Sequence, residues 1–88
     1  MANKILLSLK DFIDDYYENN HIFKASIFLG ILDDVFSKMG SFDKSTVLEM
    51  NNHLVEVTGA FERKDYYYII DYLENVFIKS DIINLLGD

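Results

Sequence analysis

The chain has 88 residues, half of them hydrophobic and 15% aromatic, and carries a net charge of −7 from 15 acidic and 8 basic side chains. This length predicts one domain, residues 1–88, with ample side chains for a core. Cysteine is absent, which excludes disulfides and thiolate chemistry. The negative charge disfavours nucleic acid and anionic membranes, because phosphates would repel the chain. We therefore expect a protein partner or self-association.

The apolar stretches are short. The longest, residues 27–32, falls far below the roughly 20 residues that a transmembrane helix needs. Residues 1–9 lack the apolar length and the cleavage site of a signal peptide. We therefore expect a soluble, cytoplasmic protein.

The first predicted helix covers residues 3–18. Apolar side chains recur every three or four residues along one face, and Asn19 and Asn20 end the pattern. The expected buried residues are Ile5, Leu6, Leu9, Phe12, Ile13 and Tyr16.

The second predicted helix, about residues 22–39, is apolar almost all round. Its polar stripe is narrow and consists of Ser26, Gly30, Asp33, Asp34 and Ser37. A helix of this kind belongs at the centre of a bundle or under an interface. Gly40 is placed to stop it.

Two further helices are predicted, at about 43–61 and 66–78. Ser41 or Asp43 is placed to cap the third helix and Asp65 the fourth. Residues 81–86 are expected to form a last short helix stopped by Gly87, or a docking segment. The expected core faces are Val47, Met50, Leu54, Val57 and Phe61, then Ile69, Leu73, Val76 and Phe77.

These patterns predict an all-α fold, a compact antiparallel bundle of about four helices with a short C-terminal helical tail. Gly30 and Gly59 fall inside predicted helices, where each costs about 1 kcal/mol relative to alanine. We therefore predict that both glycines mark close contacts between helices or across a dimer axis.

No combination of residues predicts catalysis. Glu49, His53 and Glu56 share a helix face and offer at most half of a metal site. Neighbouring acids such as Asp14 and Asp15 point about 100° apart and do not converge on one atom. Glycine-rich phosphate loops and serine elbows are also missing. We therefore predict no enzyme activity, catalytic residue, metal, cofactor or small-molecule substrate.

The tyrosines indicate a binding surface. Tyr66, Tyr67 and Tyr68 project in three directions around one helical turn, so at least one ring should be exposed. Tyr67 shares the outward arc with Asp71 and Glu74, and exposed tyrosines are enriched at binding hot spots. We predict a protein-interaction module with an acidic aromatic helical surface. Its partner-binding residues are expected to be Tyr67, Asp71 and Glu74, joined by Asp33 and Asp34.

Three alternatives to this function remain open at this point. A tyrosine can instead shield the end of the bundle. The small size and negative charge also suit an acidic inhibitor, such as an immunity protein or a DNA mimic. The apolar second helix suits a secretion or flagellar export chaperone that holds an amphipathic segment.

The second half of the chain carries three short patterns, at residues 51–56 (NNHLVE), 60–66 (AFERKDY) and 70–74 (IDYLE). They resemble the patterns N-x-x-L-x-E, A-x-E-x-x-D-Y and D-x-L-E of small uncharacterised helical proteins from Gram-positive anaerobic bacteria. The family pattern often has a tyrosine where Asn75 stands here. The resemblance implies an all-α, cytoplasmic bacterial protein and no particular activity.

Overall fold

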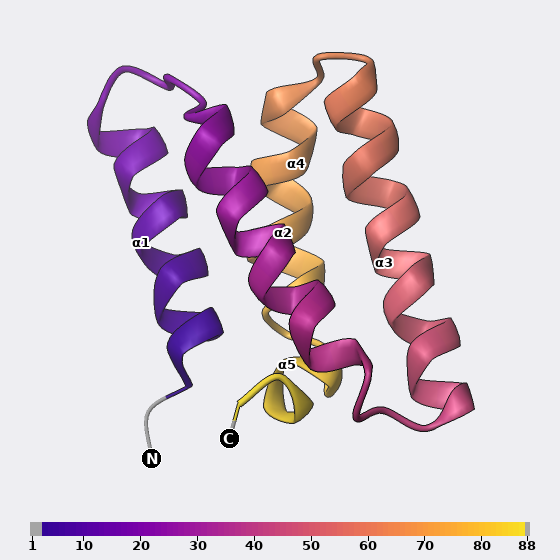
Figure 1. Ribbon diagram of the computed structural model, residues 1–88. Helices are drawn as coiled ribbons and strands as arrows, with labels where there is room; N and C mark the ends of the chain where they lie inside the picture. The colour runs from indigo at the N-terminus through magenta and orange to yellow at the C-terminus, as the bar shows by residue number, and fades with distance from the viewer. Residues whose placement is uncertain (1–2, 88) are drawn as a thin grey trace.

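The computed structural model describes residues 3–87, and the predicted all-α fold class is confirmed because these residues form helices and no strands (Figure 1). The chain forms a bundle of long helices closed at one end by a short one. No helix in residues 3–87 has both the length and the apolarity to cross a bilayer. The elements are α1 (Lys4–Glu18), α2 (Ala25–Met39), α3 (Lys44–Glu62), α4 (Tyr66–Tyr72), the π-helical turn η1 (Leu73–Phe77) and α5 (Ile82–Leu85).

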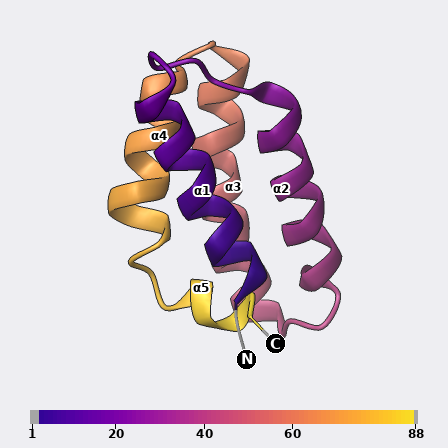
Figure 2. The ribbon, with the colours of Figure 1, turned by 90° about the vertical axis from the view of Figure 1, so that its left-hand side faces the viewer.

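The arrangement of the helices gives α1 two flanks. Seen from the side of α1, α4 lies on one flank and α2 on the other, with α3 behind (Figure 2). The backbone of α1 approaches α2 and η1 closely, while α3 packs against α4 and α5. The two flanks of α1 therefore present two separate surfaces.

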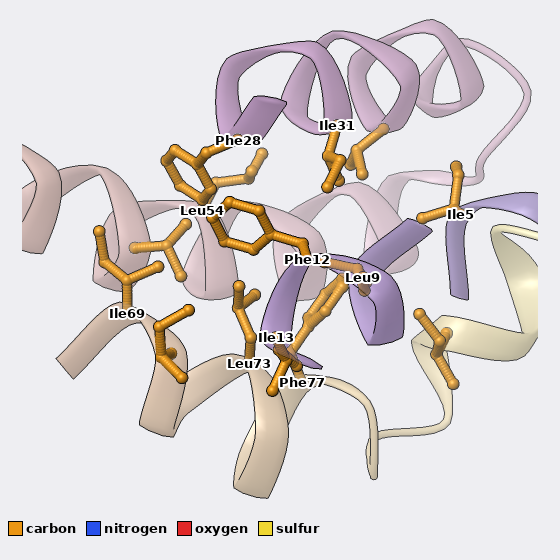
Figure 3. Close-up of a cluster of buried hydrophobic side chains, with 14 of the residues drawn as sticks. Ile5, Leu9, Phe12, Ile13, Phe28, Ile31, Leu54, Ile69, Leu73 and Phe77 are labelled. Carbon is orange, nitrogen blue, oxygen red and sulfur yellow. The ribbon is translucent and has the colours of Figure 1, made fainter. Parts of the chain in front are cut away.

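Most of the residues that the sequence predicts to be buried lie in the hydrophobic core, part of which is shown in Figure 3. On α1, all the predicted residues are buried except Leu6, which is half-buried. On α3, Ala60 is buried in addition, while Val47 and Phe61 are half-buried. The core consists of Ile5, Leu9, Phe12, Ile13, Tyr16, Phe28, Ile31, Val35, Met50, Leu54, Val57, Ala60, Ile69, Ile70, Leu73, Phe77, Ile82, Ile83 and Leu86.

The predicted start of the second helix is three residues too early. Asn20 and His21 have φ values of 59° and 60°, and left-handed residues cannot continue into a right-handed helix. Residues 19–24 therefore form a loop that connects α1 to α2, which begins at Ala25. Phe23 anchors this loop by stacking on Tyr66, with the ring centroids 4.5 Å apart.

Two places were predicted for this helix, and the centre of the bundle is wrong, while a place under an interface stays a prediction. Only Phe28, Ile31 and Val35 of α2 are buried. Ile27 and Phe36 are 51% and 50% exposed. In an antiparallel bundle each helix turns one face to the core, so Ile27, Leu29 and Phe36 of α2 face outward, while Leu32 and Met39 pack at the edge of the core. Residue type alone could not tell which face would be covered.

The predicted core face of the fourth helix fails at Val76, which is 45% exposed, while Ile70 is buried. The cause is η1, in which the Ile78 N–H donates to the Leu73 carbonyl, five residues back, at 3.0 Å. This wider turn inserts one residue into the helical repeat. Phe77 therefore takes the inward position and Val76 turns outward.

The C-terminal tail both forms a helix and docks on its own chain. Ile82, Ile83 and Leu86 are buried, and α5 lies against α3. The Asn3 side-chain amide also donates to the Ile83 carbonyl at 2.8 Å, which ties the tail to the start of α1. The tail therefore closes one end of the core.

The predicted close helix contacts at Gly30 and Gly59 are not found within residues 3–87. A Cβ added to Gly30 would meet no atom within 4 Å. One added to Gly59 would approach only Nη1 of Arg63, at 3.3 Å, which caps the same helix. Gly30 therefore faces open space, and its helical cost has no explanation in the packing of the bundle.

Candidate interaction surface

The flank of α1 that faces α4 carries exposed tyrosines among carboxylates. Tyr67 is 63% exposed and Tyr17 is 42% exposed. The Tyr17 hydroxyl donates to Oε1 of Glu74 across the two helices, at 3.2 Å. We call this region the acidic aromatic surface and define it as Asp14, Tyr17, Tyr67, Asp71 and Glu74.

The start of α4 sets the direction of its three tyrosines. Asp65 caps the helix by accepting from the Tyr68 N–H at 3.3 Å, so the first turn begins at Tyr66. Tyr66 then stacks on Phe23, and the Tyr68 hydroxyl donates to Glu56 of α3 at 2.7 Å. Tyr67 projects outward, as the sequence predicts.

Hydrogen bonds on this surface favour the protonated form of Tyr17 and fix the orientation of Asp71. The pKa of Tyr17 is raised, first by partial burial and then by the hydrogen bond to Glu74 and the charge on it. Its hydroxyl therefore stays protonated and donates. The Asn75 amide donates to Oδ1 of Asp71 at 2.9 Å, which orients that carboxylate.

Between the helices the surface is hollowed. Asp14 of α1 and Glu74 of η1 line a depression of about 230 Å³, together with Lys10, Ile13 and Ile78. Lys10 brings a positive charge to this depression, while Asp14 and Glu74 bring the carboxylates. The surface therefore combines rings, carboxylates and a concave centre.

Asp33 and Asp34, which the sequence places with Tyr67, lie elsewhere. Both are exposed on α2. Asp34 lines a groove between α1 and α2. Helix α2 flanks α1 on the side away from α4 (Figure 2). The structure thus brings Tyr67, Asp71 and Glu74 together and does not bring the two aspartates to them.

His53 is engaged inside the bundle. Its Nδ1 lies 2.7 Å from the Tyr72 hydroxyl, and its ring meets Phe77 edge-on with centroids 5.2 Å apart. Burial lowers the pKa of His53, and the charge of Glu49 acts in the opposite direction. Glu56 accepts from Tyr68 instead. Within residues 3–87 there is no group of three histidine or carboxylate side chains that could hold a metal.

Comparisons with protein-family models, curated proteins and solved structures found no match for this chain. The resemblance of residues 51–74 to small bacterial helical proteins thus stays a prediction.

Sequence reasoning missed Tyr17 and Asp14 as members of the surface. A signal was present, because Lys10, Asp14 and Tyr17 recur at helical spacing on one flank of the predicted apolar face. Which flank would meet the fourth helix depends on the order of helices around the bundle. That order is a property of the tertiary structure.

Proposed function

We propose that this protein is a protein-binding module whose acidic aromatic surface docks a basic patch of a partner. The observation that carries the proposal is the exposure of Tyr67, 63%, beside two exposed carboxylates. Its hydroxyl has no hydrogen-bond partner among residues 3–87.

The exposed ring favours binding over a structural role. A side chain stabilises a fold mainly in proportion to the apolar area that it buries, and Tyr67 leaves most of its ring in water. Tyrosine loses little conformational entropy when it is covered, so burial in a complex is efficient. The alternative in which a tyrosine shields the bundle end suits Tyr66, which stacks on Phe23.

The charges favour a basic partner. An arginine or lysine can lie over a tyrosine face and pair with a neighbouring carboxylate at the same time. Asp71 lies next to Tyr67 on the outward face of α4, and Tyr17 holds Glu74 in place. The net charge of −7 would also speed the approach of a basic protein.

The proposal is tested by capture of partners from bacterial lysate with wild-type protein and Tyr67→Ala. Loss of a hot-spot tyrosine should weaken the captured complex by about tenfold or more. Phe36→Ala is the matched control, because Phe36 is an exposed aromatic on α2, outside the surface. It should leave capture unchanged.

Equal capture by the wild type and Tyr67→Ala would refute this surface as the binding site. Repeating the capture at several salt concentrations distinguishes the proposed binding module from an acidic inhibitor that mimics DNA. A mimic of a phosphate backbone should release its partner steeply as salt rises and should not need the Tyr67 ring, whereas the proposed complex should weaken less steeply and should need that ring at every salt concentration.

A further inference from the structure

The opposite flank of α1 carries a second concave surface that the proposed function does not use. Between α1 and α2 lies an open groove of about 610 Å³. Its exposed apolar side chain is Ile27, which is 51% exposed, while Phe12 and Ile31 line it from the core and are themselves buried. We call this the α1–α2 groove.

Gly30 lines the α1–α2 groove and keeps it open. A side chain at this position would meet no atom of the described chain within 4 Å. Alanine would therefore fit and would favour the helix by about 1 kcal/mol. A glycine that nothing inside the molecule requires indicates close approach by something from outside.

The rim of the groove is acidic. Asp11, Asp15 and Asp34 contribute carboxylates, and the one lysine on the rim, Lys24, is paired with Asp15 at 3.0 Å. The rim therefore has an excess of negative charge over an apolar floor. A complementary ligand is apolar along its centre and positively charged along its edges.

We propose that the α1–α2 groove binds a basic amphipathic helix of a partner protein, with the helix approaching most closely at Gly30. The apolar face of that helix covers Ile27, and its lysines or arginines reach Asp11 and Asp34. A second copy of this chain fits poorly, because it would bring another carboxylate-rich, net negative surface against this rim.

The test uses a defined probe, a helical peptide of about 18 residues built from leucine on one face and lysine along both edges. Titration into labelled protein, followed by amide NMR shifts, should move the signals of Gly30, Ile27 and Ser8. The same peptide with glutamate in place of lysine should not bind. Gly30→Leu should weaken binding at least about tenfold, because the side chain occupies the space that the peptide needs.

Charge-matched variants provide the control. Asp11→Asn with Asp34→Asn removes two carboxylates from the rim and should weaken binding at least about threefold. Asp14→Asn with Asp71→Asn removes the same charge from the other flank of α1 and should leave binding unchanged. This pair decides the matter even if Gly30→Leu does not fold.

Equal weakening by both pairs, or shifts centred on Tyr67, would overturn the groove as the binding site. Binding of the glutamate peptide, or a dimer of this chain that Gly30→Leu disrupts, would also overturn the proposal. Tyr67→Ala distinguishes a failure of this proposal from a failure of the proposed function. This variant lacks the exposed ring of the acidic aromatic surface but should still bind the peptide in full.

Discussion

At the scale of single residues, Asn3 links three parts of the molecule. Its side-chain oxygen accepts from the Leu6 N–H at 3.0 Å and caps α1, while its amide donates to the Ile83 carbonyl at 2.8 Å. A Cβ on Gly87 would lie 2.9 Å from the same amide nitrogen. A larger residue at position 87 would therefore require the Asn3 side chain to shift away from its hydrogen bonds.

His53 gives a prediction for the pH dependence of stability. Burial lowers its pKa in the folded protein below the ordinary value of 6.5, so the unfolded chain binds a proton more readily. Stability should therefore fall as the pH drops below 6.5, and this loss is complete below the folded pKa. Urea unfolding at about pH 7.5 and about pH 5.5 measures the effect.

His53→Gln is the control, because glutamine does not titrate and can still bond to Tyr72. Carboxylates contribute equally to both proteins over this range, so the wild type should lose more stability than the variant. An equal loss in the two proteins would show that His53 is not the responsible group.

Several residue roles were predictable because they depend on neighbours close in the chain. Asp43 accepts from the Thr46 N–H at 2.8 Å and Asp65 caps α4, as predicted. The outward direction of Tyr67 follows from helical geometry alone. Phe23 was misplaced in a helix, since its partner Tyr66 lies far away in the sequence.

At the scale of elements, η1 shows how one irregular turn changes a helix face. Regular helical spacing predicts that both Val76 and Phe77 are buried, whereas with the π-helical turn Phe77 is buried as predicted and Val76 is exposed. Helix propensities carry no signal for such a turn, because they do not distinguish a bond to the residue four back from a bond to the residue five back. Helix existence was therefore predictable, and the register after Leu73 was not.

This register can be measured by truncation. Phe77→Ala removes a buried ring and should lower the free energy of unfolding by about 3–5 kcal/mol. Val76→Ala removes a partly exposed side chain and should change it by no more than about 0.5 kcal/mol. Chemical denaturation measures the free energy of unfolding of both variants. If Val76→Ala lowered this free energy as much as truncation of a buried valine does, the π-helical register would be contradicted.

At the scale of the whole molecule, the charge of −7 opposes folding. Like charges repel more strongly when the chain is compact, and salt screens this repulsion. The melting temperature should therefore rise between about 0.05 and 0.5 M sodium chloride. A gain of about 1 kcal/mol corresponds to about 4–8 °C for a domain of this size.

A charge-reduced variant tests the cause. Asp14→Asn with Asp71→Asn lowers the repulsion, so its melting temperature should depend less on salt than that of the wild type. A melting temperature that falls with sodium chloride would mean that attractive pairs such as Lys24 with Asp15, 3.0 Å apart, outweigh the repulsion.

The sequence by itself determined the helices, most of their buried faces, the caps Asp43 and Asp65 and the outward direction of Tyr67. These features follow from periodicity and short-range hydrogen bonds, which act within a few residues. Only the tertiary structure decided that Tyr17 meets Glu74, that Asp34 borders a different groove, and that half of α2 stays uncovered. Those outcomes depend on which helices become neighbours, and that choice is made by the packing of the whole core.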